Sequence, residues 1–117
     1  MPSRSPSRAV RYSRRRRRRI AQNTHDLTVA QWTALVAAWE GCAYCRATGT
    51  ALQKDCVLPI SRGGRYELAN VVPSCRSCNA SKCNAEVTTW MRRKKLDERE
   101  FLTRWVQISR MLADEPE

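Results

Sequence analysis

The amino-acid sequence predicts one small α+β domain in which a short β-hairpin is flanked by helices. Three observations predict this fold class. Apolar residues recur at helical spacing near both ends of the folded region. Residues typical of strands lie between those ends, on either side of a Gly-Gly loop. Two Cys-x-x-Cys pairs bracket this hairpin, and a chain of 117 residues has room for a single domain.

The first twenty residues differ from the rest because they carry most of the charge. They hold nine arginines and no acidic residue, whereas the remaining chain has 13 basic and 11 acidic side chains. A block of like charges repels itself and buries little apolar surface, which predicts a disordered arm over residues 1–20 and a domain over residues 21–117. We expect contact with nucleic-acid phosphates; a solubilising extension and an RNA-binding arm are the alternatives. The consecutive arginines of this arm are Arg14, Arg15, Arg16, Arg17, Arg18 and Arg19.

A first helix is expected between Thr28 and Gly41. Thr28 and Gln31 have the spacing of a capping box, in which each side chain bonds the backbone of the other. Gly41 is well placed to end the helix, because glycine readily adopts the left-handed conformation found there. The apolar residues that recur on one face are Val29, Trp32, Leu35, Val36 and Trp39.

The last third of the chain, residues 86–113, is expected to be helical. Asp97 begins an acidic stretch that resembles a capped helix start, so two successive helices are predicted. The apolar residues at helical spacing are Val87, Trp90 and Met91 in the first helix and Phe101, Trp105, Ile108 and Leu112 in the second. We expect these residues to belong to the core.

The two Cys-x-x-Cys pairs predict a metal site. Each pair presents two thiolates from a tight turn, and two pairs complete a tetrahedral shell of four sulfurs that suits Zn²⁺. A closed shell has no open position, so this zinc would stabilise the fold and perform no chemistry. An iron–sulfur cluster is the main alternative, whereas a redox pair would need a βαβ context that is absent. The predicted ligands are Cys42, Cys45, Cys75 and Cys78.

The segment between the two cysteine pairs predicts the hairpin. Its strands are expected near residues 51–58 and 70–72, with Pro73 leading into a helix. Asp55 on the first strand and Asn79 at the start of that helix would then converge. Carboxylate and amide oxygens favour Mg²⁺ or Mn²⁺. A surface acid and a helix cap are the simpler interpretation of the same two residues.

From Cys42 to Lys82 the sequence resembles the HNH endonucleases of the ββα-metal (His-Me finger) fold, especially small zinc-knuckle proteins of bacteria and phages. The resemblance covers about a third of the chain, and its motifs are specific only in combination. It implies an HNH-like core over residues 42–83 and metal-dependent hydrolysis of DNA phosphodiester bonds. The residues that carry it are Asp55, Pro59, Ser61, Gly63, Gly64, Asn70, Cys75, Cys78, Asn79 and Lys82.

The resemblance also implies residue roles. Asp55 and Asn79 would bind the catalytic Mg²⁺ or Mn²⁺, and Asn70 would tie the loop back and position the general base. The residues implied to contact DNA phosphates are Lys82, Arg62 and Arg65.

The residue after Asp55 departs from the family's pattern. The family has a histidine there, which deprotonates the attacking water, but this chain has Cys56. A thiol with an ordinary pKa of about 8.5 is mostly protonated at neutral pH unless a cation or metal lowers that pKa. Cys56 would therefore be a poorer base, so a working nuclease, a slow nuclease and a DNA-binding module without cleavage remain open. Burial of Cys56 as a small core residue is a further alternative.

Two other residues bear on this question. His25, the one histidine, precedes the first helix and is expected on the surface beside Asp26. Cys83 is expected to face inward from its helix, where it and Cys56 could form a redox-sensitive pair.

No segment approaches the roughly 20 apolar residues that span a bilayer, so a soluble protein of the cytoplasm is expected, in a bacterium or a phage-infected host. DNA is the expected partner. A homodimer and a complex with a phage or host protein stay open.

Overall fold

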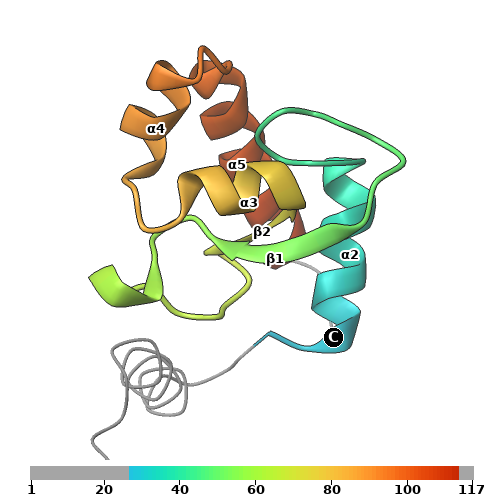
Figure 1. Cartoon of the computed structure of the whole chain (residues 1–117). Coiled ribbons are helices and arrows are strands. Elements are labelled where there is room, and N and C mark those ends of the chain that lie inside the picture. The colour runs from blue at the N-terminus through green and yellow to red at the C-terminus, as the bar shows by residue number, and fades with distance from the viewer. Residues whose placement is uncertain (1–26, 114–117) are drawn as a thin grey trace, which may run out of the picture.

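The structure is a computed structural model that describes residues 27–113 (Figure 1). It has the predicted α+β fold, with a two-stranded sheet and helices around it. The predicted arm over residues 1–20 lies outside the described residues, and so does His25. The elements are α2 (Val29–Trp39), β1 (Leu52–Cys56), a 3₁₀ turn (Ile60–Arg62), β2 (Val71–Cys75), α3 (Arg76–Lys82), α4 (Val87–Arg93) and α5 (Glu98–Ala113).

The two strands pair antiparallel, with Asp55 opposite Val72. β2 extends to Cys75 and is longer than predicted, because Pro73 is part of the strand. Proline has no N–H for a ladder, but its carbonyl accepts a hydrogen bond of 2.9 Å from the Ala43 N–H on the side away from β1. β1 is shorter than predicted, because the Leu58 N–H bonds the side chain of Asn70 instead of a partner strand.

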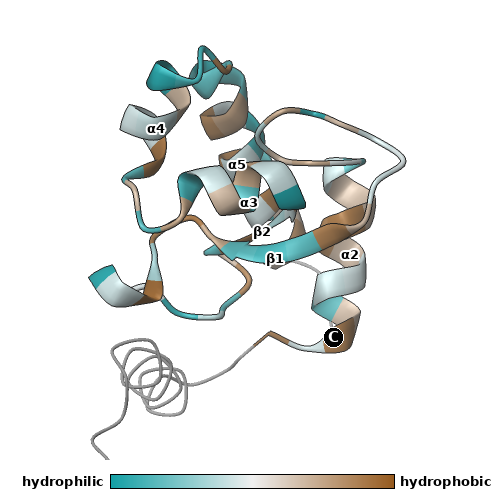
Figure 2. Ribbon diagram, in the orientation of Figure 1, coloured by the Kyte–Doolittle hydropathy of each residue, from teal (hydrophilic) through white to brown (hydrophobic). Residues whose placement is uncertain are grey.

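Helices cover the sheet on both faces. α3 packs against both strands, whereas α2 packs against β2 and α5 (Figure 1). Every residue of β2 is buried for this reason. Figure 2 shows hydrophilic residues along the middle of β1, where the sequence is Gln53-Lys54-Asp55. Of this stretch, Gln53 and Asp55 contact α3, whereas the Lys54 ammonium lies 5.7 Å from the centroid of the Trp32 ring of α2.

An aromatic cluster forms the centre of the core. Trp39 stacks on Phe101 with 5.7 Å between ring centroids. Tyr44 meets Trp90 edge to face at 5.2 Å and lies 5.0 Å from Phe101. Such pairs contribute about 0.5–1.5 kcal/mol each beyond the area that they bury. α4 and α5 are thus joined to the turn that carries Cys42 and Cys45.

The predicted apolar stripes are confirmed in most positions. Leu35, Trp39, Trp90, Met91, Phe101, Ile108 and Leu112 are all buried. Val29 is an error in the prediction, because it lies in the first turn of α2, beyond the edge of the core, and is 81% exposed. The Thr28 capping box is present, with hydrogen bonds of 3.0 and 2.9 Å to and from Gln31.

The end of α2 differs from the prediction by one residue. Glu40 takes the left-handed position, with φ 60°. Gly41 has another role: a Cβ at this position would lie 2.6 Å from the Ala47 carbonyl oxygen. The glycine therefore allows the chain to approach the cysteine turn closely. None of the helices within residues 27–113 has the length and apolar character needed to cross a membrane.

Candidate active site and metal centre

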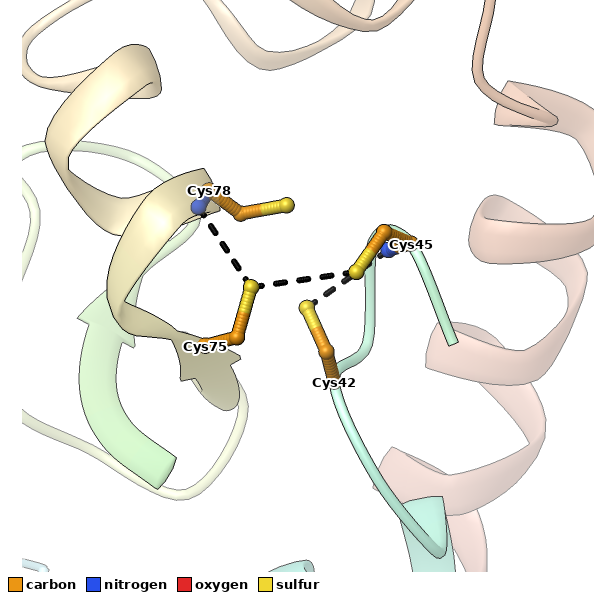
Figure 3. A group of neighbouring side chains, drawn as sticks. All are labelled: Cys42, Cys45, Cys75 and Cys78. Atoms are coloured by element: carbon orange, nitrogen blue, oxygen red, sulfur yellow. Dashed lines mark hydrogen bonds between the residues drawn. The ribbon is translucent and has the colours of Figure 1, made fainter. Parts of the chain in front are cut away.

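The four predicted zinc ligands come together in the structure. Cys42 and Cys45 lie in the turn after α2, Cys75 ends β2, and Cys78 lies on α3. Their sulfurs all lie within 4.8 Å of one another, and the four side chains point toward a common centre (Figure 3). The Cys45 and Cys75 sulfurs are 3.7 Å apart. A tetrahedral ion with Zn–S distances of about 2.3 Å holds its sulfurs about 3.8 Å apart. The cluster thus fits a metal such as zinc.

The electrostatics of this cluster also favour a cation. Burial raises the pKa of the Cys45 and Cys78 thiols. Burial acts in the same direction on Cys42, but hydrogen bonds from the backbone of Cys45, Cys75 and Tyr44 outweigh it and lower the Cys42 pKa to about 7. Of these three thiols Cys42 ionises most readily, and Cys45 and Cys78 resist ionisation beside it. A bound metal ion removes that conflict, because it neutralises the four sulfurs together.

Asp55 lies near the end of β1 and is 7% exposed. Its Oδ2 accepts a hydrogen bond of 2.5 Å from the Tyr44 hydroxyl and lies 3.2 Å from Lys82 Nζ. Burial and the neighbouring carboxylate raise the Tyr44 pKa well above its usual value, so the hydroxyl stays protonated and donates a hydrogen bond to Asp55. Neither of these contacts uses Oδ1, the other oxygen of the carboxylate.

Asp55 and Asn79 line the same cavity, which has a volume of about 460 Å³. Asn79 is on α3, and its Nδ2 donates a hydrogen bond of 2.6 Å to Gln53 Oε1 on β1. That bond fixes the orientation of the amide and leaves its Oδ1 for another partner. Gln53 and Asp55 are two residues apart on one strand, so both side chains face α3. The cavity thus has one carboxylate and one amide with a free oxygen each.

Cys56 lines this cavity too and is 8% exposed. Its thiol donates a weak hydrogen bond of 3.9 Å to the Arg65 carbonyl oxygen. The same carbonyl accepts a bond of 3.0 Å from Asn70 Nδ2. The cysteine is therefore both a buried residue and a cavity residue beside Asp55, and Asn70 holds the carbonyl toward which its thiol points.

Asn70 closes the loop between the two strands. Its Oδ1 accepts a bond of 2.8 Å from the Leu58 N–H, and its Nδ2 donates to the Leu58 carbonyl at 3.0 Å. Gly64 allows this closure, since a Cβ there would lie 1.7 Å from the Leu58 oxygen. The structure agrees here with the expectation that Asn70 ties the loop back.

Residues 42–95 match the family model described as HNH endonuclease. This segment belongs to the HNH endonuclease family. We call residues 42–95 the HNH segment; it contains the four cysteines, the hairpin, α3 and α4, and ends before α5. Among the curated proteins and the solved structures, none matches the chain.

The position of Lys82 differs from the one expected for it. It was expected to contact DNA phosphates, but it is 1% exposed. Its Nζ donates a hydrogen bond of 3.0 Å to the Cys56 carbonyl and pairs with Asp55. The reason is that α3 packs on the sheet, so a residue at this position points into β1. A buried lysine is tolerated only when it is paired, and Asp55 supplies the partner.

The other basic residues of the HNH segment agree better with a role at the surface. Arg62 and Arg65 are exposed, so phosphate contact by them stays a prediction. Arg62 Nε also donates a bond of 3.0 Å to the Asn84 carbonyl, which ties the 3₁₀ turn to the end of α3. The arm from Arg14 to Arg19 lies outside the described residues. Cys83 is exposed, contrary to expectation, because α3 ends at Lys82 and helical spacing no longer applies.

The polar residues of the cavity and its surroundings that the sequence analysis missed include Tyr44, Gln53, Lys54 and Arg76. The spacing of Gln53 and Asp55 in a strand is the one signal that places a second polar side chain next to the carboxylate. Tyr44 has no such signal. Its position inside the first cysteine pair indicates only burial near the metal.

Proposed function

We propose that the protein is a metal-dependent endonuclease that hydrolyses DNA phosphodiester bonds, by nicking or by double-strand cleavage. One observation carries this proposal: Asp55, Cys56 and Asn79 line a single cavity within the HNH segment. The family match supports a nuclease, and the cavity supplies the oxygen donors that such a nuclease needs.

The donor set fits a hard divalent cation. Asp55 Oδ1 and Asn79 Oδ1 are oxygens of the kind that Mg²⁺ and Mn²⁺ prefer, and each is left free by the contacts of its own side chain. Two protein oxygens leave the other positions for water and a phosphate. When bound, the ion supplies a Lewis acid that binds the scissile phosphate and stabilises the leaving oxygen.

In this proposal Cys56 takes the proton from the attacking water, because it lines the cavity beside Asp55. With the thiol proton directed at the Arg65 carbonyl, the sulfur accepts a second proton only after it has lost its own. Cleavage at neutral pH therefore depends on the thiolate fraction of Cys56 or on solvent as the base. We expect a slow enzyme for this reason.

DNA binding would use the basic surface outside the cavity. Exposed Arg62 and Arg65 flank the hairpin loop, and the six arginines from Arg14 to Arg19 would add contacts without sequence preference. Binding that relies on phosphates weakens steeply as salt rises, because each contact releases counterions. A homodimer or a partner protein would be needed only for concerted cutting of both strands.

A second candidate function is DNA binding without cleavage. Two observations favour it: Cys56 stands where the family has its base, and the buried Lys82 ammonium offsets the charge of Asp55. Both features weaken catalysis, and neither removes the basic surface. The two functions differ in what they require of Asp55.

Cleavage of supercoiled plasmid in Mg²⁺, and separately in Mn²⁺, tests the proposal. The zinc-loaded protein is compared with Asp55→Asn, Cys56→His and the control Glu67→Gln, which makes the same chemical change outside the cavity. We expect nicking by the wild type and the control, none by Asp55→Asn, and faster nicking by Cys56→His.

Two outcomes contradict this expectation. If the wild type is inert and Cys56→His cuts, the scaffold is intact and the natural protein is a binder. If neither protein cuts while both still bind DNA, the nuclease proposal is overturned.

A further inference from the structure

The end of α4 carries the densest run of positive charge among the described residues. Four basic side chains follow one another there, and all are exposed: Arg92, Arg93, Lys94 and Lys95. Figure 2 shows hydrophilic residues at this end of α4. We call Arg93, Lys94 and Lys95 the α4 corner. It closes the HNH segment and does not line the cavity beside Asp55.

The acidic residues next to the α4 corner have other partners. Glu98 pairs with Arg92, with 2.6 Å between Oε1 and Nε. Asp97 Oδ1 accepts a hydrogen bond of 3.0 Å from the Glu100 N–H, in the first turn of α5. Within residues 27–113 the three cations of the α4 corner form no ion pair. Three positive charges therefore face solvent together.

The backbone at Lys95 would be more stable with another residue. The Leu96 N–H bonds the Met91 carbonyl at 2.9 Å, which is the helix ending whose left-handed position is usually occupied by glycine. Lys95 occupies that position, with φ 57°. A residue with a Cβ is strained in this conformation, so glycine would suit the turn better.

The helix dipole does not account for the whole run either. Basic side chains in the last turn of a helix interact favourably with its dipole, and Arg92 and Arg93 are in the last turn of α4. Lys94 and Lys95 follow that turn. The charge of Lys95 is thus retained in a position where folding favours glycine, which points to a role in binding.

Consecutive unpaired cations on a surface complement a row of phosphates. Lysine presents a compact charge on a flexible stem, which suits contact that is independent of base sequence. Exposed Arg62 bears the same charge, and its Nε bonds the Asn84 carbonyl in the link between α3 and α4. Figure 1 shows the 3₁₀ turn, this link and α4 in succession along one side of the molecule. Both ends of that side therefore attract a polyanion.

We infer that the α4 corner binds DNA phosphates outside the cavity, and that it contributes to the affinity for DNA without contacting the reacting atoms. The inference rests on the proposed function for its partner and adds a second contact surface to it. At Lys95 the end of α4 is less stable than it would be with glycine, and the side chain raises the affinity for DNA.

A pair of double variants tests the contact. The full-length, zinc-loaded protein is titrated into a fluorescent DNA duplex without added Mg²⁺ or Mn²⁺, and anisotropy gives the Kd at several salt concentrations. Lys94→Gln with Lys95→Gln is compared with Arg46→Gln and Arg110→Gln combined, which removes the same charge elsewhere; Arg46 already pairs with Glu100.

We expect the variant of the α4 corner to bind DNA several-fold more weakly. The slope of log K against log salt should become smaller by about 1–2, because each contact with a duplex phosphate contributes about 0.9. The control variant should keep the wild-type slope.

Lys95→Gly separates binding from folding. We expect its melting temperature to rise by a few degrees, because the left-handed strain is removed, and its DNA Kd to rise as well. Glu40→Gly is the matched control, since Glu40 ends α2 in the same conformation, with φ 60°. It should raise the melting temperature without weakening DNA binding. A purely structural role for Lys95 would not oppose stability to affinity in this way.

Four outcomes contradict the inference. A wild-type Kd and salt slope in the variant of the α4 corner would overturn it and leave the proposed nuclease intact. Equal losses in the two double variants would assign the effect to overall charge and overturn it too. Tighter binding of a matched RNA, lost in the same variant, would overturn DNA as the partner of the corner. Absence of DNA binding by the wild type would overturn the inference and the proposed function together.

Discussion

The Tyr44 hydroxyl donates a hydrogen bond of 2.5 Å to Asp55 Oδ2. Tyr44 lies between Cys42 and Cys45, so this bond connects the four-cysteine cluster to the proposed catalytic carboxylate. The ring of Tyr44 is held in turn by Trp90 and Phe101. Because Tyr44 occupies Oδ2 together with Lys82, it directs the other oxygen of Asp55 into the cavity. Tyr44 is therefore a positioning residue for Asp55.

Tyr44→Phe tests this role, because it removes the hydroxyl and keeps the ring. We expect the Mg²⁺ concentration for half-maximal nicking to rise several-fold, since Asp55 can then rotate. A hydrogen bond to a charged group contributes about 1.5–3 kcal/mol, so denaturant unfolding should show a loss of that order. Ile108→Val provides a control that lowers stability without touching Asp55. An unchanged Mg²⁺ dependence in Tyr44→Phe would contradict the positioning role.

Lys82→Met tests the buried ion pair. Removal of one partner leaves Asp55 buried without its cation, which should lower the free energy of unfolding by about 3–5 kcal/mol. Lys94→Met is the matched control, because Lys94 is exposed and should change stability by less than about 0.5 kcal/mol. Denaturant unfolding of both variants measures the difference. Equal free energies of unfolding for Lys82→Met and Lys94→Met would show that the ion pair between Lys82 and Asp55 contributes nothing to stability.

Cys78→Ser tests the zinc site against an ordinary cysteine. Cys78 belongs to the four-sulfur cluster, whereas Cys83 is exposed and outside it. We expect Cys78→Ser to lose bound zinc and most of its cooperative unfolding transition, because metal binding in small domains is part of the folding free energy. Cys83→Ser should keep its zinc and its melting temperature. A chelator added to the wild type should reproduce the effect of Cys78→Ser in circular dichroism.

Gly64→Ala tests the closure of the loop. The added Cβ would meet the Leu58 carbonyl oxygen at 1.7 Å, so the backbone must shift and the Asn70 bonds to Leu58 must lengthen. We expect a loss of about 1–3 kcal/mol or more in stability, as for other overpacked sites. Gly49→Ala is the comparison, because a Cβ there meets no atom within 4 Å and adds only the strain of φ +73°. If Gly49→Ala is the more damaging of the two, the close approach is not what requires Gly64.

The features that the sequence predicted well are those decided within a few residues. Thr28 and Gln31 form a capping box because the first turn of any helix brings them together. The cysteine pairs likewise present their sulfurs from tight turns, and the strand between them follows from Pro, Gly and β-branched residues. The presence of an α+β fold with a four-cysteine cluster therefore followed from local patterns.

The features that were missed depend on how distant segments pack. Lysine is usually found at the surface, and only the packing of α3 on β1 buries Lys82 beside Asp55. Tyr44 becomes a partner of Asp55 because the cysteine turn folds back onto the hairpin. The continuation of β2 through Pro73 depends on Ala43, whose N–H donates a hydrogen bond to the Pro73 carbonyl on the side away from β1. The spacing of residues within one helix or strand does not predict such contacts between distant segments.

The position of the Tyr44 ring also limits how the domain can be divided. The HNH segment ends at residue 95, but Phe101 of α5 lies against Tyr44 at 5.0 Å. A chain shortened to the family boundary would thus lose one wall around the hydroxyl that orients Asp55, and it would open Trp39 to solvent. The HNH segment is consequently not sufficient by itself. A graft of this segment into another host protein would have to include α5 together with the four cysteines.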